Sequence, residues 1–106
     1  MIKGVGIQAG FDIVEVPGTN GWFDTDLAAK FSYGADAFKQ GYDFGFIHIK
    51  AVDVAGHEKS ADLKMEMLEK ADRELEKFLE AMREEELLVC VTGDHSTPIR
   101  VGDHTH

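Results

Sequence analysis

The chain has 106 residues, 43% of them hydrophobic, and a formal net charge of −9. A chain of this length forms one domain at most. Its acidic balance excludes a nucleic-acid-binding surface, because neutralising phosphates requires clustered Lys and Arg.

The sequence also excludes a membrane-spanning segment. No apolar run approaches the roughly 20 residues that cross a bilayer, and the first residues lack the charged-then-apolar pattern of a secretory signal. The one cysteine, Cys90, cannot form an internal disulfide, which fits a reducing compartment. Within "LLVCV" we predict it to be a small buried apolar residue. We therefore expect a cytoplasmic protein with no membrane partner.

The first half of the chain predicts a strand and a helix after an ambiguous start. Residues 1–10, "MIKGVGIQAG", fit a helix or a strand. Residues 12–18, "DIVEVPG", alternate apolar and polar side chains up to a Pro-Gly stop, as a short strand does. Residues 25–41 fit a helix that ends at Gly41.

The second half predicts a strand, a long helix and another strand. Residues 42–52, "YDFGFIHIKAV", are aromatic and β-branched and fit a largely buried strand. The helix spans 60–85: Ser60 can cap it, and its apolar residues recur at three- and four-residue spacing. Residues 87–94, "LLVCVTGD", form a continuous apolar strand that ends at a polar pair. This order predicts right-handed crossovers and an α/β domain with a parallel sheet.

Two acid–histidine pairs occupy matching places in this order. Asp53 and His57 follow the carboxyl end of the second predicted strand, and Asp94 and His95 follow that of the third. Open α/β sheets bind ligands outside the carboxyl ends of their strands, so we expect the two pairs to meet on one rim. His104 follows after a short loop that could fold back over the same rim.

Each pair taken alone has an ordinary structural explanation, as a polar loop, a cap or a turn. Two pairs at equivalent strand ends, with a third histidine close behind, favour a metal site. Carboxylate and imidazole ligands suit Mn, Zn or Fe, and the lack of a cysteine cluster excludes a thiolate site. Hydrolytic and phosphoryl-transfer centres often hold two such ions about 4 Å apart.

Three further residues have two interpretations each. His48 either lines the rim or is a hydrogen-bonded strand histidine. Lys50 either reaches a phosphate from the strand end or is a solvated charge. His106 is either a spare ligand or part of a frayed end.

Several segments together resemble a known family. The segments "DFGFIHIKAVDVAGHEKS", "VCVTGDHSTP" and "VGDHTH", with "IKGVGIQAGFDIVEVPGTNGWFDT" upstream, closely resemble the carboxyl-terminal part of archaeal-type cofactor-independent phosphoglycerate mutases. These enzymes belong to the alkaline phosphatase superfamily. The resemblance covers the whole chain, and it is specific because ordered motifs match at the right separations. It implies a three-layer fragment of an alkaline-phosphatase-like α/β domain.

The resemblance also implies a metal content and a reaction. The positions of Asp53, His57 and His104 hold one divalent ion, and those of Asp94 and His95 hold a second, together with an amino-terminal aspartate and a nucleophilic serine. We expect Mn first, with Mg, Zn or Co as the other candidates, and no 2,3-bisphosphoglycerate. The serine would carry the phosphoryl group between the 2- and 3-hydroxyls of its substrate, phosphoglycerate.

The departures from the family are equally informative. Ser32, Ser60 and Ser96 do not occupy the nucleophile's motif, so we expect no catalytic residue in this chain. Residues 1–106 are expected to be a single partial domain, truncated at both ends, inactive alone and able to self-associate through uncovered strand edges. Two alternatives stay open: another phosphomutase or phosphatase of the superfamily, and a non-catalytic metal-binding or assembly module.

Overall fold

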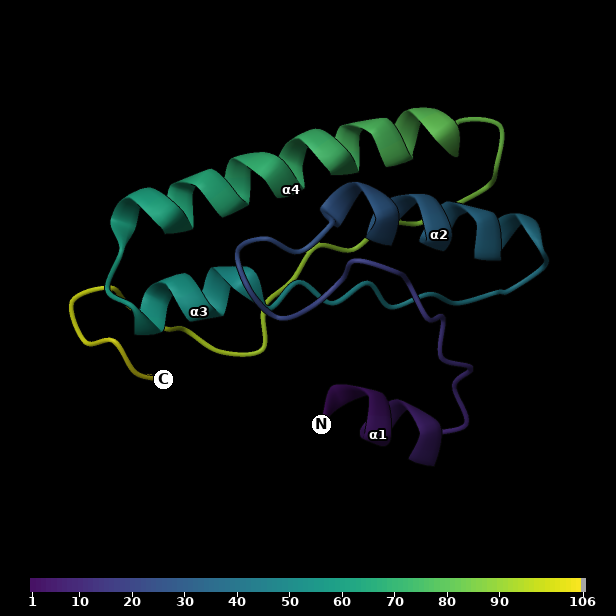
Figure 1. Ribbon diagram of the computed structural model, residues 1–106. Coiled ribbons are helices and arrows are strands. Elements are labelled where there is room, and N and C mark those ends of the chain that lie inside the picture. Colours follow the sequence, from purple (N-terminus) through teal and green to yellow (C-terminus); the bar gives the residue numbers. More distant parts are fainter. Residues whose placement is uncertain (106) are drawn as a thin grey trace.

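The computed structural model describes residues 1–105 and contains four helices. The helix α4 lies across both α2 and α3, and α1 stands apart from the other three (Figure 1). No helix within residues 1–105 is long and apolar enough to cross a membrane. His106 lies outside the described residues, so its two interpretations stay open. The helices are α1 (Ile2–Gln8), α2 (Leu27–Lys39), α3 (Ala51–His57) and α4 (Ala61–Ala81).

The helix α2 lies within the predicted range 25–41. The Asp26 carboxylate caps it by accepting a hydrogen bond of 2.8 Å from the Ala29 backbone N–H, which would otherwise have no partner. Leu27, Phe31 and Ala35, spaced four residues apart, form its buried face. The chain leaves the helix through a glycine, Gly41, at a φ of +106°, a conformation that favours glycine.

The helix α4 begins where the sequence predicts and ends four residues earlier than predicted. The Ser60 hydroxyl accepts the Leu63 backbone N–H at 3.2 Å and caps it, as expected. Its buried Phe78 packs against Phe31 of α2, with ring centroids 5.9 Å apart. This aromatic pair, with Ala35 and Met82, forms the core between α2 and α4.

The strand predicted over 42–52 is wrong at its end, because residues 51 and 52 belong to the helix α3. Ala51, Val54 and Ala55 are buried, and their three- and four-residue spacing gives α3 an apolar face. That face packs against α4. The aromatic run before Ala51 obscured this short helical pattern. As a result, the polar residues after position 52 lie on a helix and not in a loop.

The predicted parallel sheet is not seen in residues 1–105. The three predicted strands, 12–18, 42–52 and 87–94, form no ladder, and the only β-pairing described is an isolated antiparallel bridge between Ser96 and Thr105. Alternation and β-branching predict an extended chain, but a strand also needs hydrogen bonds from a neighbouring strand. The sheet prediction is therefore wrong for this structure, although the order of helices and extended segments is kept.

One extended segment still shows the two faces that a strand would have. Ile47 and Ile49 pack against the core between α2 and α4, whereas Phe46 and His48 are exposed, their rings 6.2 Å apart and nearly parallel. The alternating side chains explain why residues 42–50 read as a strand.

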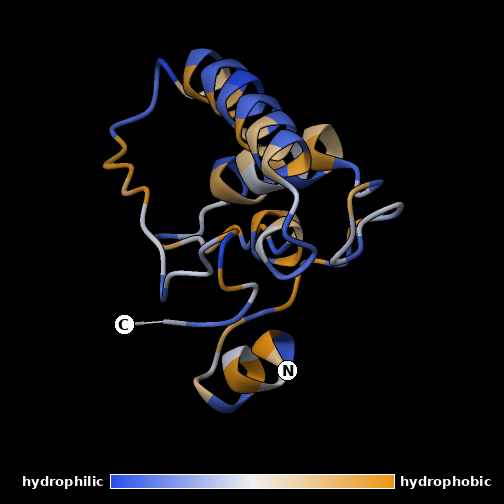
Figure 2. Ribbon diagram, turned by 90° about the vertical axis from the view of Figure 1, so that its left-hand side faces the viewer, coloured by the Kyte–Doolittle hydropathy of each residue, from blue (hydrophilic) through white to orange (hydrophobic). Residues whose placement is uncertain are grey.

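The extended segment after α4, residues 87–94, exposes apolar side chains. Its apolar part is coloured as hydrophobic in Figure 2. Leu88 is 95% exposed and Val91 is 77% exposed. Cys90 is exposed as well, so the prediction that it is buried is wrong. Continuous apolar exposure on an unpaired segment favours association with another chain.

We predict that the 106-residue chain self-associates through this segment. In sedimentation velocity, the wild type should sediment faster as its concentration rises. The double substitution Leu88→Lys with Val91→Lys should shift it towards the monomer, because lysine opposes the burial of this surface. Leu68→Lys, at an exposed leucine on α4, serves as the control and should still associate. A wild type that stays monomeric at every concentration would contradict the prediction.

Candidate metal centre

The helix α3 places an acid and a histidine on one of its faces. Asp53 and His57 are four residues apart, so they project from neighbouring turns on the same side. The Asp53 Oδ1 lies 3.3 Å from the His57 Nε2. Both residues keep some exposure, with side-chain values of 23% and 38%, so the site is open to solvent on one side.

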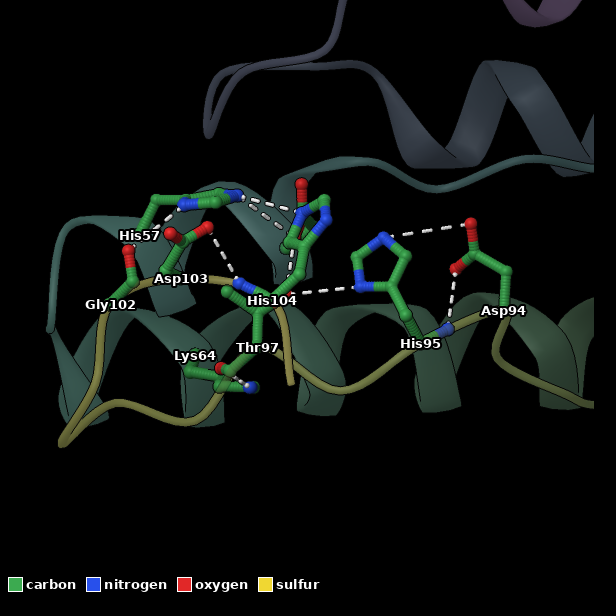
Figure 3. Close-up of polar contacts among 9 residues, drawn as sticks. His57, Lys64, Asp94, His95, Thr97, Gly102, Asp103 and His104 are labelled. Atoms are coloured by element: carbon green, nitrogen blue, oxygen red, sulfur yellow. Dashed lines mark hydrogen bonds and ion pairs between the residues drawn. The ribbon is translucent and has the colours of Figure 1, made fainter. Parts of the chain in front are cut away.

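The carboxyl-terminal tail brings a second histidine to this pair. The tail turns at Pro98, whose carbonyl accepts the backbone N–H groups of Val101 and Gly102, and it returns so that the Thr105 N–H donates to the Ser96 carbonyl at 3.0 Å. This hairpin-like return carries His104 over α3, where its side chain meets that of His57 (Figure 3).

Asp53, His57 and His104 bring three potential ligand atoms together. The His104 Nε2 lies 3.1 Å from the His57 Nε2 and 3.4 Å from the Asp53 Oδ1. With the third distance of 3.3 Å, these atoms form a nearly equilateral triangle. Tetrahedral ligands at roughly 2.0–2.1 Å from a zinc ion are about 3.3–3.4 Å apart. The donor set and its spacing therefore fit one divalent ion.

A backbone carbonyl orients the His57 ring. The His57 Nδ1 lies 3.1 Å from the Gly102 carbonyl oxygen. Because a carbonyl only accepts, Nδ1 must carry the proton and donate it, which leaves a lone pair on Nε2. Gly102 has a φ of +73°, which favours glycine at this turn. The turn thus selects the tautomer of His57 that can bind a metal.

A hydrogen bond from Thr97 holds the carboxylate of Asp53 in place. The Thr97 hydroxyl donates to the Asp53 Oδ1 at 2.6 Å, and Thr97 is 5% exposed. Its carbonyl accepts from the Lys64 Nζ at 2.9 Å, so α4 also holds this part of the tail.

The carboxylate of Asp53 is held in its ionised form. Partial burial favours the neutral acid, but the hydrogen bond from Thr97 and the nearby His57, with the two other histidines, together outweigh it. The net effect lowers the pKa of Asp53 below its usual value. Ionised carboxylate is the form that binds a cation.

The second acid–histidine pair lies directly beside the first site. The Asp94 Oδ2 and the His95 Nε2 are 3.6 Å apart, and the Asp94 Oδ1 accepts the His95 backbone N–H at 3.1 Å. The His95 ring lies against the His104 ring, with centroids 3.7 Å apart. Figure 3 shows the side chains as one row that runs from His57 to Asp94. The structure thus brings together all five residues that the sequence analysis selected as ligands.

His48 and Lys50 lie near this row. Within residues 1–105, no hydrogen bond links either side chain to it. Burial and then the charge of Lys30 lower the pKa of His48, while Asp94 acts in the opposite direction. The Lys30 Nζ donates to the His48 carbonyl at 2.8 Å. Lys50 precedes α3, with its aliphatic stem against Gly21. Both residues keep the two interpretations given above.

The sequence analysis did not single out two residues of the site. Thr97 and Gly102 lie in segments quoted for the family resemblance, next to predicted ligands, but neither is itself of a type that commonly binds these metals through its side chain. Their roles depend on a hydroxyl and a carbonyl that act on ligands elsewhere in the chain. Only the folded tail reveals them.

The donor set fits a divalent ion, and comparison with known proteins shows the superfamily of the chain. Residues 2–106 match the sequence pattern of the Metalloenzyme superfamily, so the chain belongs to that superfamily. The resemblance stated above is thereby confirmed at the level of the superfamily.

Named relatives narrow the class further. The chain is 42% identical over 105 residues to the 2,3-bisphosphoglycerate-independent phosphoglycerate mutase of Thermococcus kodakarensis, covering 99% of the chain and 25% of that protein. It is 44% identical over 106 residues to the enzyme of the same name from Methanopyrus kandleri, again with 99% and 25% coverage.

A solved structure has the same fold as the chain. The structure of the PH0037 protein from Pyrococcus horikoshii matches with a TM-score of 0.92 and 40% identity. The match covers 97% of this chain and 31% of that one. The chain thus spans about a quarter of the length of the curated relatives it matches, 25% in both mutases named above.

We predict that Gly56→Ala damages the centre. A Cβ at Gly56 would lie 2.5 Å from the Thr97 carbonyl oxygen, so the backbone must shift. The expected loss is about 1–3 kcal/mol in the free energy of unfolding, measured by thermal unfolding with circular dichroism. Gly4→Ala is the matched control, because a Cβ there meets nothing within 4 Å. It should leave stability unchanged or raise it by at most about 1 kcal/mol. Equal stability of the two variants would contradict the close approach.

Proposed function

We propose that this chain is the metal-binding part of a 2,3-bisphosphoglycerate-independent phosphoglycerate mutase. The observation that carries the proposal is the convergence of the Asp53 Oδ1 with the Nε2 atoms of His57 and His104, all within 3.4 Å of one another. Membership of the Metalloenzyme superfamily and the names of the relatives support it. These residues come from two segments that are 47 residues apart in the sequence, α3 and the tail, and the fold brings them together.

The proposed assignment has two ions. Asp53, His57 and His104 would hold the first, and Asp94 and His95 would contribute to the second. One carboxylate with two imidazoles suits Mn or Zn, and the oxygen-richer second set suits Mn or Mg. We therefore propose Mn as the physiological ion, with Mg, Zn and Co as alternatives, and no 2,3-bisphosphoglycerate as cofactor.

The reaction we propose is the interconversion of 2- and 3-phosphoglycerate through a phosphoserine, with the serine supplied from outside these residues. Bound divalent ions would stabilise negative charge on phosphoryl oxygens during transfer. This chain's own contribution is to keep Asp53 ionised, to hold the Nε2 lone pair of His57 towards the ion, and to close the site with His104. A cytoplasmic location fits the single cysteine.

We predict that the 106-residue chain binds one Mn²⁺ or Zn²⁺ ion at this centre. Isothermal titration calorimetry should show uptake by the wild type, and Asp53→Ala should weaken the affinity by at least about 10–100-fold, the loss that removal of an outer-shell partner already causes. Asp43→Ala removes the same charge from an exposed position and should bind like the wild type. Equal affinity of the wild type and Asp53→Ala would disprove the site.

The mutase activity itself can be tested in a chimera. We expect that exchanging the matching quarter of the Thermococcus kodakarensis enzyme for this chain yields a protein that converts 3-phosphoglycerate to 2-phosphoglycerate. The same chimera with Asp53→Ala should fall to background, because it lacks a ligand of the first ion. The conversion can be followed by coupling the product to enolase. A folded chimera that binds Mn²⁺ and yet converts no substrate would contradict the proposal.

A further inference from the structure

Thr97 contacts both candidate metal sites through one hydroxyl group. Its Oγ1 lies 2.6 Å from the Asp53 Oδ1 and 3.3 Å from the His95 Nδ1. Asp53 belongs to the set proposed for the first ion, and His95 to the set proposed for the second. In Figure 3, Thr97 lies beside His104, with His57 to its left and His95 to its right.

The single proton of the hydroxyl decides the direction of both hydrogen bonds. A carboxylate only accepts, so the short contact with Asp53 requires Thr97 to donate its proton there. The Oγ1 can then only accept in its contact with His95. The His95 Nδ1 must therefore carry a proton and donate it to Thr97.

This direction fixes the chemistry of the opposite ring nitrogen. A neutral imidazole that is protonated on Nδ1 has its lone pair on Nε2. The His95 Nε2 is the atom that faces the Asp94 Oδ2 at 3.6 Å. The hydroxyl of Thr97 thus leaves free the nitrogen that would bind an ion together with Asp94.

The hydroxyl is itself held in place from two sides. The Cγ2 and Cβ of Thr97 pack so closely on Gly56 of α3 that a Cβ there would lie 2.8 and 3.0 Å from them. The Thr97 carbonyl accepts from Lys64 of α4. Two helices therefore set the position from which Thr97 directs Asp53 and His95, and the side chain is buried.

We propose that Thr97 is a positioning residue that joins the two metal sites, orienting the Asp53 carboxylate and setting the His95 tautomer through one hydroxyl. The proposal rests on the proposed function, because it takes Asp53 and His95 as metal ligands. It adds a residue that would orient ligands of both ions without being a ligand itself, and it gives a reason why the two sites should respond together.

The tautomer can be read directly in the metal-free wild type. Nitrogen-15 chemical shifts of the imidazoles, from long-range proton–nitrogen correlation spectra at neutral pH, distinguish protonated from unprotonated ring nitrogens. We expect His95 to be protonated on Nδ1. A His95 protonated on Nε2 instead would overturn the proposal without any variant being made.

Two substitutions separate the hydroxyl from the packing of the side chain. Thr97→Val keeps the shape and removes the hydroxyl, whereas Thr97→Ser keeps the hydroxyl. We expect Thr97→Val to weaken Mn²⁺ affinity in calorimetry by about 10–100-fold, as for other outer-shell partners, and to release His95 from the Nδ1 tautomer. Thr97→Ser should retain both properties. A Thr97→Val protein with unchanged affinity and an unchanged His95 tautomer would refute the positioning role.

The readouts also distinguish this inference from the proposed function. A wild type that shows the Nδ1 tautomer of His95 but takes up no Mn²⁺ would overturn the proposed metal site. It would leave the hydrogen-bond directions at Thr97 established. A wild type that binds Mn²⁺ but has His95 protonated on Nε2 would overturn the role of Thr97. It would leave the proposed metal site in place.

Discussion

The packing of the carboxyl-terminal tail against α3 is the contact on which the centre depends. Thr97 rests on Gly56, a position where a methyl group would collide with the tail backbone. From there the tail turns at Pro98 and returns to pair Thr105 with Ser96. Without this contact, His104 would not reach the helix that carries Asp53 and His57. The close approach of the tail therefore requires a residue without a side chain at this position in the last turn of α3.

The same contact explains how the centre is preorganised. Each ligand of the proposed first ion has a partner on its far side: Thr97 for Asp53, the Gly102 carbonyl for His57, and the His95 ring against His104. Such outer partners fix the direction of ligand lone pairs before an ion arrives. They come from the tail, so tail order and metal affinity should vary together. The core between α2 and α4 supports this arrangement at a distance, because α4 holds both α3 and the Thr97 carbonyl.

The sequence predicted those parts of the structure that follow from local pattern. Ser60 reads as a cap and acts as one, and the long helix after it follows from its apolar spacing. The short helix α3 was hidden because the β-branched run up to Lys50 dominates its neighbourhood. The sheet prediction was wrong for a different reason. Residues 42–50 alternate as a strand should, but a strand also needs a hydrogen-bonded neighbouring strand, and the periodicity of one segment does not show whether such a neighbour is present. The candidate ligands were predicted from acid–histidine spacing and family resemblance, whereas Thr97 and Gly102 act through tertiary hydrogen bonds that no local pattern records.

The central claim, that α3 and the tail form one metal centre, is tested most directly by anomalous scattering from crystals of the chain grown with Mn²⁺. The account predicts an anomalous peak within about 2.0–2.2 Å of the Asp53 carboxylate and the Nε2 atoms of His57 and His104. Strong peaks located only elsewhere on the molecule, with these three side chains placed as described, would contradict it.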